Sequence, residues 1–120
     1  MKILIVDDSK AMRAIVRRAL AASPTYASAE IVEAADGSEA LGLIPEVQPD
    51  VVLSDWNMPE MTGIELLEAL NAGGSAPPFG FVTSESTPEM FDRAKATGAR
   101  FLVSKPFTPE ALASALDGAL

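Results

Sequence analysis

The chain has 120 residues, of which 48 % are hydrophobic, and a formal net charge of −8. This length predicts a single domain over residues 1–120 with a sizeable core, and the hydrophobic content excludes a disordered chain. The sequence contains no Cys and no His, which excludes disulfides, Cys- or His-based nucleophilic catalysis and the common zinc sites. The negative net charge disfavours nucleic acid and anionic membranes as direct partners.

The first predicted element is a strand at residues 3–6, a continuous apolar run of the kind found in central parallel strands. The run stops at Asp7 after four residues, which is too short for the hydrophobic region of a signal peptide. No apolar run further along the chain approaches the roughly 20 residues of a membrane span. We therefore expect a cytoplasmic protein without membrane insertion.

The second predicted element is an amphipathic helix at residues 10–22, because apolar side chains recur there at helical spacing. The positions expected to face inward are Met12, Ile15, Val16 and Ala19. The opposite side carries three arginines, which we expect on a solvated face, namely Arg13, Arg17 and Arg18.

The remaining strands are predicted from apolar runs at residues 27–33, 51–54, 79–83 and 101–103. The first of these runs mixes apolar and charged positions and reads as an edge strand. Four more helices are expected after the N-cap residues Asp36, Thr62, Thr87 and Thr108. The helix after Asp36 is expected to end at Pro45 or just before it, and the helix after Thr87 should turn Phe91 inward and stop at Gly98.

Strand and helix alternate five times, which predicts an α/β fold with a doubly wound parallel sheet covered by helices on both faces. In such a sheet the ligand site lies beyond the carboxyl ends of the strands, at the topological switch point. The polar residues that follow the four central strands at this edge are Asp7, Asp8, Asp55, Thr83, Ser84, Ser104 and Lys105.

The three carboxylates at this edge require positive charge nearby, since two carboxylates about 4 Å apart repel by roughly 4 kcal/mol at an effective dielectric constant of about 20. Lys105 supplies one charge, and a hard divalent cation is the natural remainder. Mg²⁺ prefers oxygen ligands and is usually held by one or two carboxylates together with a phosphate. Asp8 and Asp55 could bind it directly and Asp7 through water, and a carbonyl of the Trp56-Asn57 loop could add a further oxygen.

A cation and Lys105 would also keep one carboxylate ionised as a nucleophile, and an aspartate carboxylate is known to form an aspartyl phosphate. Phosphoryl transfer needs in-line geometry and neutralisation of charge on the phosphoryl oxygens. Mg²⁺, Lys105 and the Thr83 hydroxyl could contact those three oxygens.

Four short motifs stand at these strand ends, namely Asp7-Asp8, Asp55 with Met58-Pro59 and Gly63, Thr83-Ser84, and Lys105-Pro106-Phe107. Together, and in this order, they resemble the receiver domain of two-component response regulators over the whole chain. The stretch that follows Asp55 is especially similar to single-domain, chemotaxis-type regulators. The resemblance implies a flavodoxin-like fold, with a five-stranded sheet in the order 2-1-3-4-5 and five flanking helices.

By this resemblance, Asp55 accepts a phosphoryl group from a phosphohistidine on a sensor histidine kinase or a phosphotransfer protein. The residues implied to hold Mg²⁺, for which Mn²⁺ is a plausible substitute, are Asp7, Asp8, Asp55 and, through its carbonyl, Asn57. Thr83 and Lys105 bind the phosphoryl group, and the Lys105–Pro106 peptide bond is expected to be cis.

Phosphorylation is then expected to draw Thr83 inward and to let the aromatic ring of Phe101 turn in. This switch reshapes the surface of the fourth helix, fifth strand and fifth helix for an output protein, for which the flagellar motor switch is a candidate. Phe101 stands where chemotaxis regulators typically carry a tyrosine. Asn57 and Glu85 are expected to tune dephosphorylation.

Simpler interpretations remain open for single residues. Asp7-Asp8 could cap the first helix, Lys105 could be a solvated surface lysine, and Trp56 is expected to be a partly exposed neighbour of the site without a chemical role. For the whole chain, the alternatives are a Mg²⁺-dependent phosphohydrolase with an aspartyl-phosphate intermediate, a receiver fragment of a larger regulator, and a degenerate receiver. The absence of His and of a lid insertion favours a phosphoacceptor that catalyses only its own phosphotransfer and autodephosphorylation.

Overall fold

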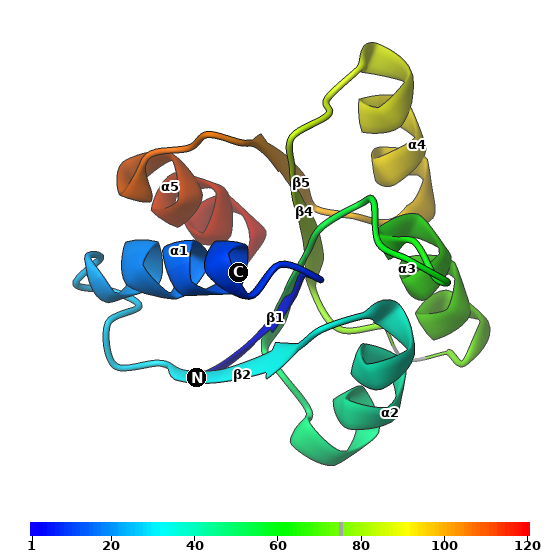
Figure 1. Cartoon of the computed structure of the whole chain (residues 1–120), viewed down its shortest axis with the longest axis horizontal. Coiled ribbons are helices and arrows are strands. Elements are labelled where there is room, and N and C mark those ends of the chain that lie inside the picture. The colour runs from blue at the N-terminus through cyan, green and yellow to red at the C-terminus, as the bar shows by residue number, and fades with distance from the viewer. Residues whose placement is uncertain (75) are drawn as a thin grey trace.

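A computed structural model describes residues 1–74 and 76–120 and places a parallel sheet at the centre of the molecule (Figure 1). In this part of the chain the sheet has five strands in the order β2-β1-β3-β4-β5, which confirms the predicted order. The strands are β1 (Lys2–Val6), β2 (Glu30–Ala34), β3 (Val51–Ser54), β4 (Phe79–Thr83) and β5 (Phe101–Ser104).

Helices cover both faces of the sheet (Figure 1). On one face lie α1 (Lys10–Ala21) and α5 (Pro109–Ala119), and on the other lie α2 (Gly37–Val47), α3 (Gly63–Ala72) and α4 (Pro88–Thr97). Each face has its own apolar core, because successive strand side chains point to opposite sides. In β1, for example, Ile3 and Ile5 belong to the core under α1 and α5, whereas Leu4 and Val6 belong to the other core.

The start of each of these helices is set by a local side-chain cap. The cap side chain accepts a hydrogen bond from the backbone N–H three residues further on, and the caps are Ser9, Asp36, Thr62, Thr87 and Thr108. The four caps predicted from the sequence are thus confirmed. At α3 the cap is a full capping box, since Glu65 also accepts from the Thr62 N–H at 2.9 Å.

Two predicted boundaries are wrong. β2 begins at Glu30, later than expected, because the Ser23 carbonyl accepts two turn hydrogen bonds at 3.1 and 2.8 Å and the chain turns before it becomes extended. α2 continues through Pro45, which removes one backbone donor without ending the helix. The Gln48 N–H still donates to the Ile44 carbonyl at 2.9 Å, and Gln48 ends the helix in the left-handed conformation with φ of 52°.

Two apolar side chains that were expected to face inward are exposed instead. Ile15 is 46 % and Phe91 is 50 % exposed. The buried stripe of α1 is centred on Val16 and Leu20, one position beyond the expected stripe, so Ile15 lies at its edge. α4 contacts the sheet through Ala94, and Phe91 lies beside that contact and faces solvent.

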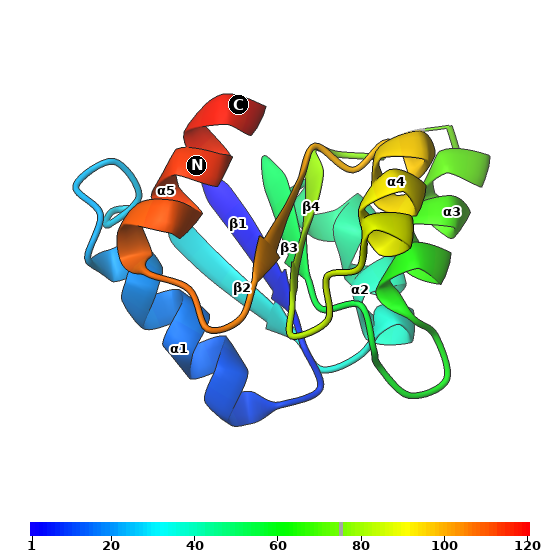
Figure 2. The same ribbon diagram turned by 90° about the horizontal axis from the view of Figure 1, so that it is seen from above.

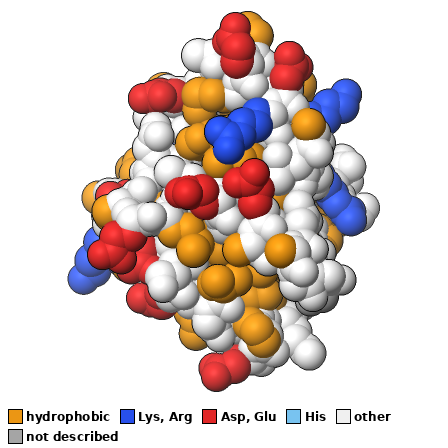
Figure 3. Space-filling view, turned by 90° about the vertical axis from the view of Figure 1, so that its right-hand side faces the viewer, with side chains coloured by type: hydrophobic (Ala, Val, Ile, Leu, Met, Phe, Trp, Pro, Cys, Tyr) orange, Lys and Arg blue, Asp and Glu red, His pale blue; other side chains and the backbone are white. Residues whose placement is uncertain are grey.

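The loops after the strands gather at one edge of the sheet, the lower side of Figure 2. On the helical face formed by α2, α3 and α4, hydrophobic side chains gather over α2 and α3 (Figure 3), where Leu41, Ile44, Ala69 and Leu70 line an open groove. None of the helices in the described residues has the length and apolar character needed to cross a bilayer.

Candidate metal centre

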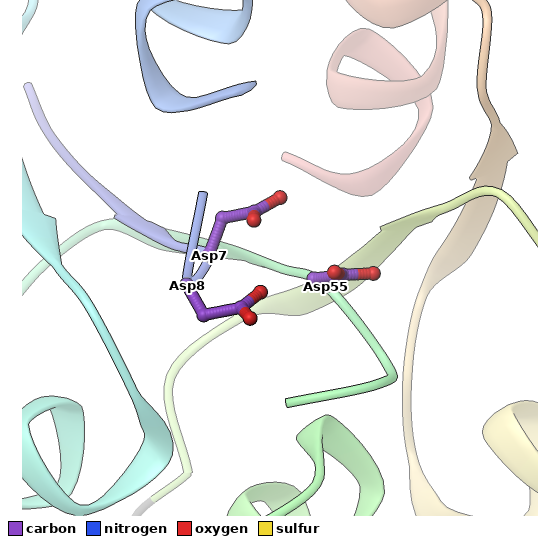
Figure 4. Close-up of side chains that lie close together, drawn as sticks. All are labelled: Asp7, Asp8 and Asp55. Atoms are coloured by element: carbon purple, nitrogen blue, oxygen red, sulfur yellow. The ribbon is translucent and has the colours of Figure 1, made fainter. Parts of the chain in front are cut away.

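Three carboxylates meet at the edge where the strands end. Asp7 and Asp8 follow β1, and Asp55 follows the neighbouring strand β3. Their side chains extend into the same space (Figure 4), and one oxygen of each lies within 4.8 Å of the others. The predicted convergence of strand ends therefore brings these residues together, in the region where a doubly wound sheet places its ligands.

Asp7 is the most constrained of the three. Its side chain is buried, Oδ1 accepts a hydrogen bond from the Ser9 N–H at 2.9 Å, and Oδ2 accepts one from Lys105 Nζ at 3.0 Å. The cap of α1 is Ser9 itself, whose hydroxyl accepts from the Met12 N–H at 3.2 Å. The interpretation of Asp7-Asp8 as the cap of the first helix is therefore wrong, and the exposed Asp8 carboxylate faces the shared space (Figure 4).

Lys105 comes from the loop after β5 and reaches across the sheet edge to this cluster. Its Nζ lies 3.0 Å from Asp7 Oδ2 and 3.6 Å from Asp55 Oδ2, and its side chain is only 13 % exposed. The interpretation as a solvated surface lysine is therefore wrong. The Lys105–Pro106 peptide bond is cis, the conformation that the resemblance implies.

The electrostatics of Asp55 reflect this crowding. Burial raises the pKa of the Asp55 carboxyl, the Lys105 ammonium lowers it, and the Asp7 carboxylate raises it, with a net rise above the ordinary value. The Trp56 N–H donates to Asp55 Oδ1 at 2.8 Å and fixes that oxygen. Three carboxylates beside one ammonium leave excess negative charge, and their oxygens are the ligands that a hard divalent cation prefers. The residues present thus fit Mg²⁺.

The loop after Asp55 is anchored under the site. Trp56 is buried, not partly exposed as expected, because its ring packs against Phe81 of β4 with ring centroids 4.7 Å apart. The Trp56 carbonyl accepts a hydrogen bond from the Gly63 N–H at 2.8 Å. Asn57, whose carbonyl was expected to serve the cation, is exposed in this loop.

Thr83 ends β4 and is fully buried, with Oγ1 accepting a hydrogen bond from the Glu85 N–H at 3.3 Å. Glu85 itself is exposed. Thr83 and Glu85 therefore lie at the carboxyl edge of the sheet, as the sequence predicts.

The assignment of Phe101 as the side chain that turns in behind Thr83 does not fit the sheet. Phe101 pairs with Gly80 and packs in the core under α1 and α5. Thr83 pairs with Ser104, two residues from Leu102, so Thr83 and Leu102 share the opposite face, and Leu102 packs in the core under α2, α3 and α4. The residue of β5 that lies on the same face as Thr83 is therefore Leu102.

Two residues near the cluster were missed or only partly understood from the sequence. Arg13 was expected in solvent, yet its Nη1 donates to the Asp7 carbonyl at 2.6 Å. Gly63 belongs to the recognised motif, but its reason is spatial, since a Cβ there would lie 2.1 Å from the Asp55 carbonyl oxygen. Both contacts join residues brought together by folding, and the helical pattern around Arg13 gave only the signal of a polar face.

Comparison with known proteins gives a consistent result. A family model for the response regulator receiver domain matches residues 3–117. Chemotaxis protein CheY of Pseudomonas aeruginosa is 37 % identical over 119 residues, which cover 98 % of this chain and 94 % of that protein. A chemotaxis protein CheY homolog of Campylobacter jejuni is 35 % identical over 123 residues, which cover 100 % of this chain and 92 % of that protein.

Solved structures of similar proteins have the same fold over nearly the whole chain. Chemotaxis protein CheY4 of Vibrio cholerae superposes with a TM-score of 0.87 at 39 % identity, covering 99 % of this chain and 98 % of that chain. The signal receiver domain of the putative response regulator NarL from Mycobacterium tuberculosis superposes with a TM-score of 0.86 at 32 % identity, covering 98 % of this chain and 94 % of that chain.

Proposed function

The chain belongs to the response regulator receiver domain family, and from this premise we propose that Asp55 accepts a phosphoryl group from a phosphohistidine of a sensor histidine kinase or phosphotransfer protein. The observation that carries the proposal is the cluster of Asp7, Asp8 and Asp55 within 4.8 Å, with Lys105 Nζ at 3.0 and 3.6 Å from two of them. Residues 1–120 act as one receiver domain in this proposal.

Each group has a defined task in the transfer. A carboxylate oxygen of Asp55 forms the new O–P bond as the P–N bond of the phosphohistidine breaks, and the imidazole nitrogen keeps the electron pair. Asp55 Oδ1 is held by the Trp56 N–H, and Oδ2 faces Lys105. Lys105 can then pair with a phosphoryl oxygen, and the Thr83 hydroxyl is assigned to a second oxygen.

The residues that would hold Mg²⁺, or Mn²⁺ in its place, are Asp7, Asp8, Asp55 and the Asn57 carbonyl. A bound cation supplies charge neutralisation on the phosphoryl oxygens. Asp7 is already held by Ser9 and Lys105, whereas Asp8 is exposed at the mouth of the cluster. Asp8 is therefore the carboxylate most free to adjust to the cation.

The output of this receiver is proposed to start at Thr83 and to reach the surface formed by α4, β5 and α5. On the face of β5 that Thr83 shares, Leu102 takes the part that the sequence assigned to Phe101. The relatives named as chemotaxis proteins support a chemotaxis role. The location proposed for the protein is the cytoplasm, and the partner proposed for it is a component of the flagellar motor switch. Asn57 and Glu85 are proposed to set the lifetime of the phosphorylated state.

The proposal is tested by incubating the protein with Mg²⁺ and a small-molecule phosphodonor and measuring the intact mass. We expect one phosphoryl group on the wild type, none on Asp55→Asn, and one on the control Asp92→Asn, because Asp92 is an exposed residue of α4 away from the cluster. Labelling of Asp55→Asn to the wild-type level would refute the proposal. Multiple turnovers on metabolite phosphates would instead favour the phosphohydrolase.

A further inference from the structure

Arg13 makes two contacts that tie the candidate site to the edge strand. Its Nη1 donates to the backbone carbonyl of Asp7 at 2.6 Å, and its Nε donates to Glu33 Oε1 at 2.9 Å. The side chain is only 14 % exposed, although it belongs to the polar side of α1. A charge-assisted hydrogen bond to a carbonyl is stronger than a neutral one, and here it is shielded from water.

The carbonyl that Arg13 holds belongs to the peptide bond between Asp7 and Asp8. On the strand side, the Asp7 N–H donates to the Ala34 carbonyl of β2 at 3.1 Å, which fixes the start of this segment. The Arg13 contact holds the next peptide plane, which ends at the Cα atom that carries the Asp8 side chain. The Asp8 carboxylate is exposed and can adjust to a cation, and its backbone determines the space that this carboxylate can reach.

Glu33 holds the guanidinium of Arg13 in this place. Glu33 lies in β2 beside Ile5 of β1, and it bonds both Arg13 and Arg17 of α1. The hydrogen bonds from Arg17 and Arg13 hold the pKa of Glu33 below its ordinary value, so it stays charged. The planar fork of an arginine can bond a carboxylate and a carbonyl together, whereas the single ammonium of a lysine offers no such rigid geometry.

We propose that Arg13 is a positioning residue of the cation site, acting through the Asp7 carbonyl with Glu33 as its anchor. This inference rests on the proposed function, because it assigns Arg13 to the Mg²⁺ site of the phosphoacceptor. Groups that orient metal ligands without touching the metal typically change its affinity 10–100-fold when they are removed.

Arg17 provides a matched control. It lies one turn further along α1, is 49 % exposed, and bonds Glu33 Oε2 at 2.8 and 3.2 Å. Its contacts in the described residues go to Glu33 and not to Asp7. A residue that merely ties α1 to β2 would behave like Arg17, whereas a residue that positions the site would not.

The test is a Mg²⁺ titration of wild type, Arg13→Met, Arg13→Lys and Arg17→Met. Binding is monitored by the fluorescence of Trp56, whose backbone N–H donates a hydrogen bond to Asp55. Circular dichroism and urea unfolding check that each variant is folded. We expect the Mg²⁺ dissociation constant to rise about tenfold in Arg13→Met, to rise less in Arg13→Lys, and to stay within about twofold in Arg17→Met. At saturating Mg²⁺, labelling of Arg13→Met by the phosphodonor should approach the wild-type rate.

Unchanged Mg²⁺ affinity in Arg13→Met, or an equal loss in Arg17→Met, would overturn the inference and leave the proposed function intact. If Arg13→Met does not fold, Arg13→Lys decides, since wild-type affinity in that variant would overturn the inference as well. A wild-type chain that shows no response to Mg²⁺ by fluorescence or calorimetry would contradict the cation site itself, and the role of Arg13 would fall with it.

Discussion

Replacing Gly63 with alanine tests the packing beneath the phosphoacceptor. Gly63 is the first residue of α3, and a Cβ at this position would lie 2.1 Å from the Asp55 carbonyl oxygen and 2.8 Å from Cε1 of Phe81. The obstructing oxygen belongs to the backbone of the residue proposed to be phosphorylated, so it cannot rotate away. Either α3 or the Asp55 loop must move.

Overpacking a protein core typically lowers the free energy of unfolding by about 1–3 kcal/mol. Because the obstruction at Gly63 is a backbone atom, we expect Gly63→Ala to lie at the upper end of this range, at about 3 kcal/mol. The control is Gly42→Ala, because a Cβ at Gly42 of α2 has no neighbour within 4 Å among the described residues. Alanine there should gain up to about 1 kcal/mol from helix propensity. Urea unfolding followed by Trp56 fluorescence gives both values, and phosphodonor labelling should be slower in Gly63→Ala.

The refuting result is specific. If the free energy of unfolding of Gly63→Ala is less than about 1 kcal/mol below that of wild type, and the variant is labelled at the wild-type rate, the contact between α3 and the Asp55 backbone is not as tight as the structure shows. If Gly42→Ala is destabilised equally, the loss at Gly63 reflects the substitution of a helical glycine rather than a clash.

Three further predictions concern the sheet, the acidic cluster and a helix end. Gly80→Ala should lower the free energy of unfolding by about 1–2 kcal/mol, because a Cβ there would lie 2.1–2.4 Å from ring atoms of Phe101. In a Phe101→Leu background the same substitution should lower it by less than about 0.5 kcal/mol, and a double-mutant cycle measures this difference. Because the pKa of Asp55 is raised in the folded protein, the free energy of unfolding falls as pH rises from the unfolded-state pKa through the folded-state pKa. Without Mg²⁺, Asp55→Asn should therefore be more stable than wild type at pH 7. The urea midpoints of the two proteins should converge below the ordinary aspartate pKa of about 3.9. Gln48→Gly should raise the free energy of unfolding by about 0.5 kcal/mol, since Gln48 has φ of 52° and the strain relieved slightly exceeds the added chain entropy; a lower urea midpoint would contradict this.

Much of the fold was predictable because its signals are local. Thr62 caps α3 through Glu65, three residues away, and strands such as β3 are short apolar runs with a turn on either side. The candidate site was predictable for a different reason: parallel strands place their ends at one edge, so Asp7 and Asp55 had to meet once the alternation of strand and helix was recognised.

The failures share a physical cause, which is that they depend on the facing of single side chains. Phe101 and Leu102 point to opposite faces of the sheet, and only Leu102 shares the face of Thr83, so an assignment one residue off places the side chain in the other core. Trp56 is buried by Phe81 of β4, and Arg13 leaves the solvent side of α1 to bond Glu33, 20 residues further along the chain. Neither partner can be identified before the sheet order and register are known.

The central claim, that Asp55 is the phosphoacceptor, is tested most directly by locating the modified residue. The protein is phosphorylated with a small-molecule donor in the presence of Mg²⁺, the acyl phosphate is reduced with borohydride, and the product is mapped by peptide mass spectrometry. We expect conversion of Asp55 to homoserine, dependent on Mg²⁺ and on the donor. Modification at Asp7 or Asp8 instead, or a phosphoryl group on a serine or threonine that resists borohydride, would contradict the claim.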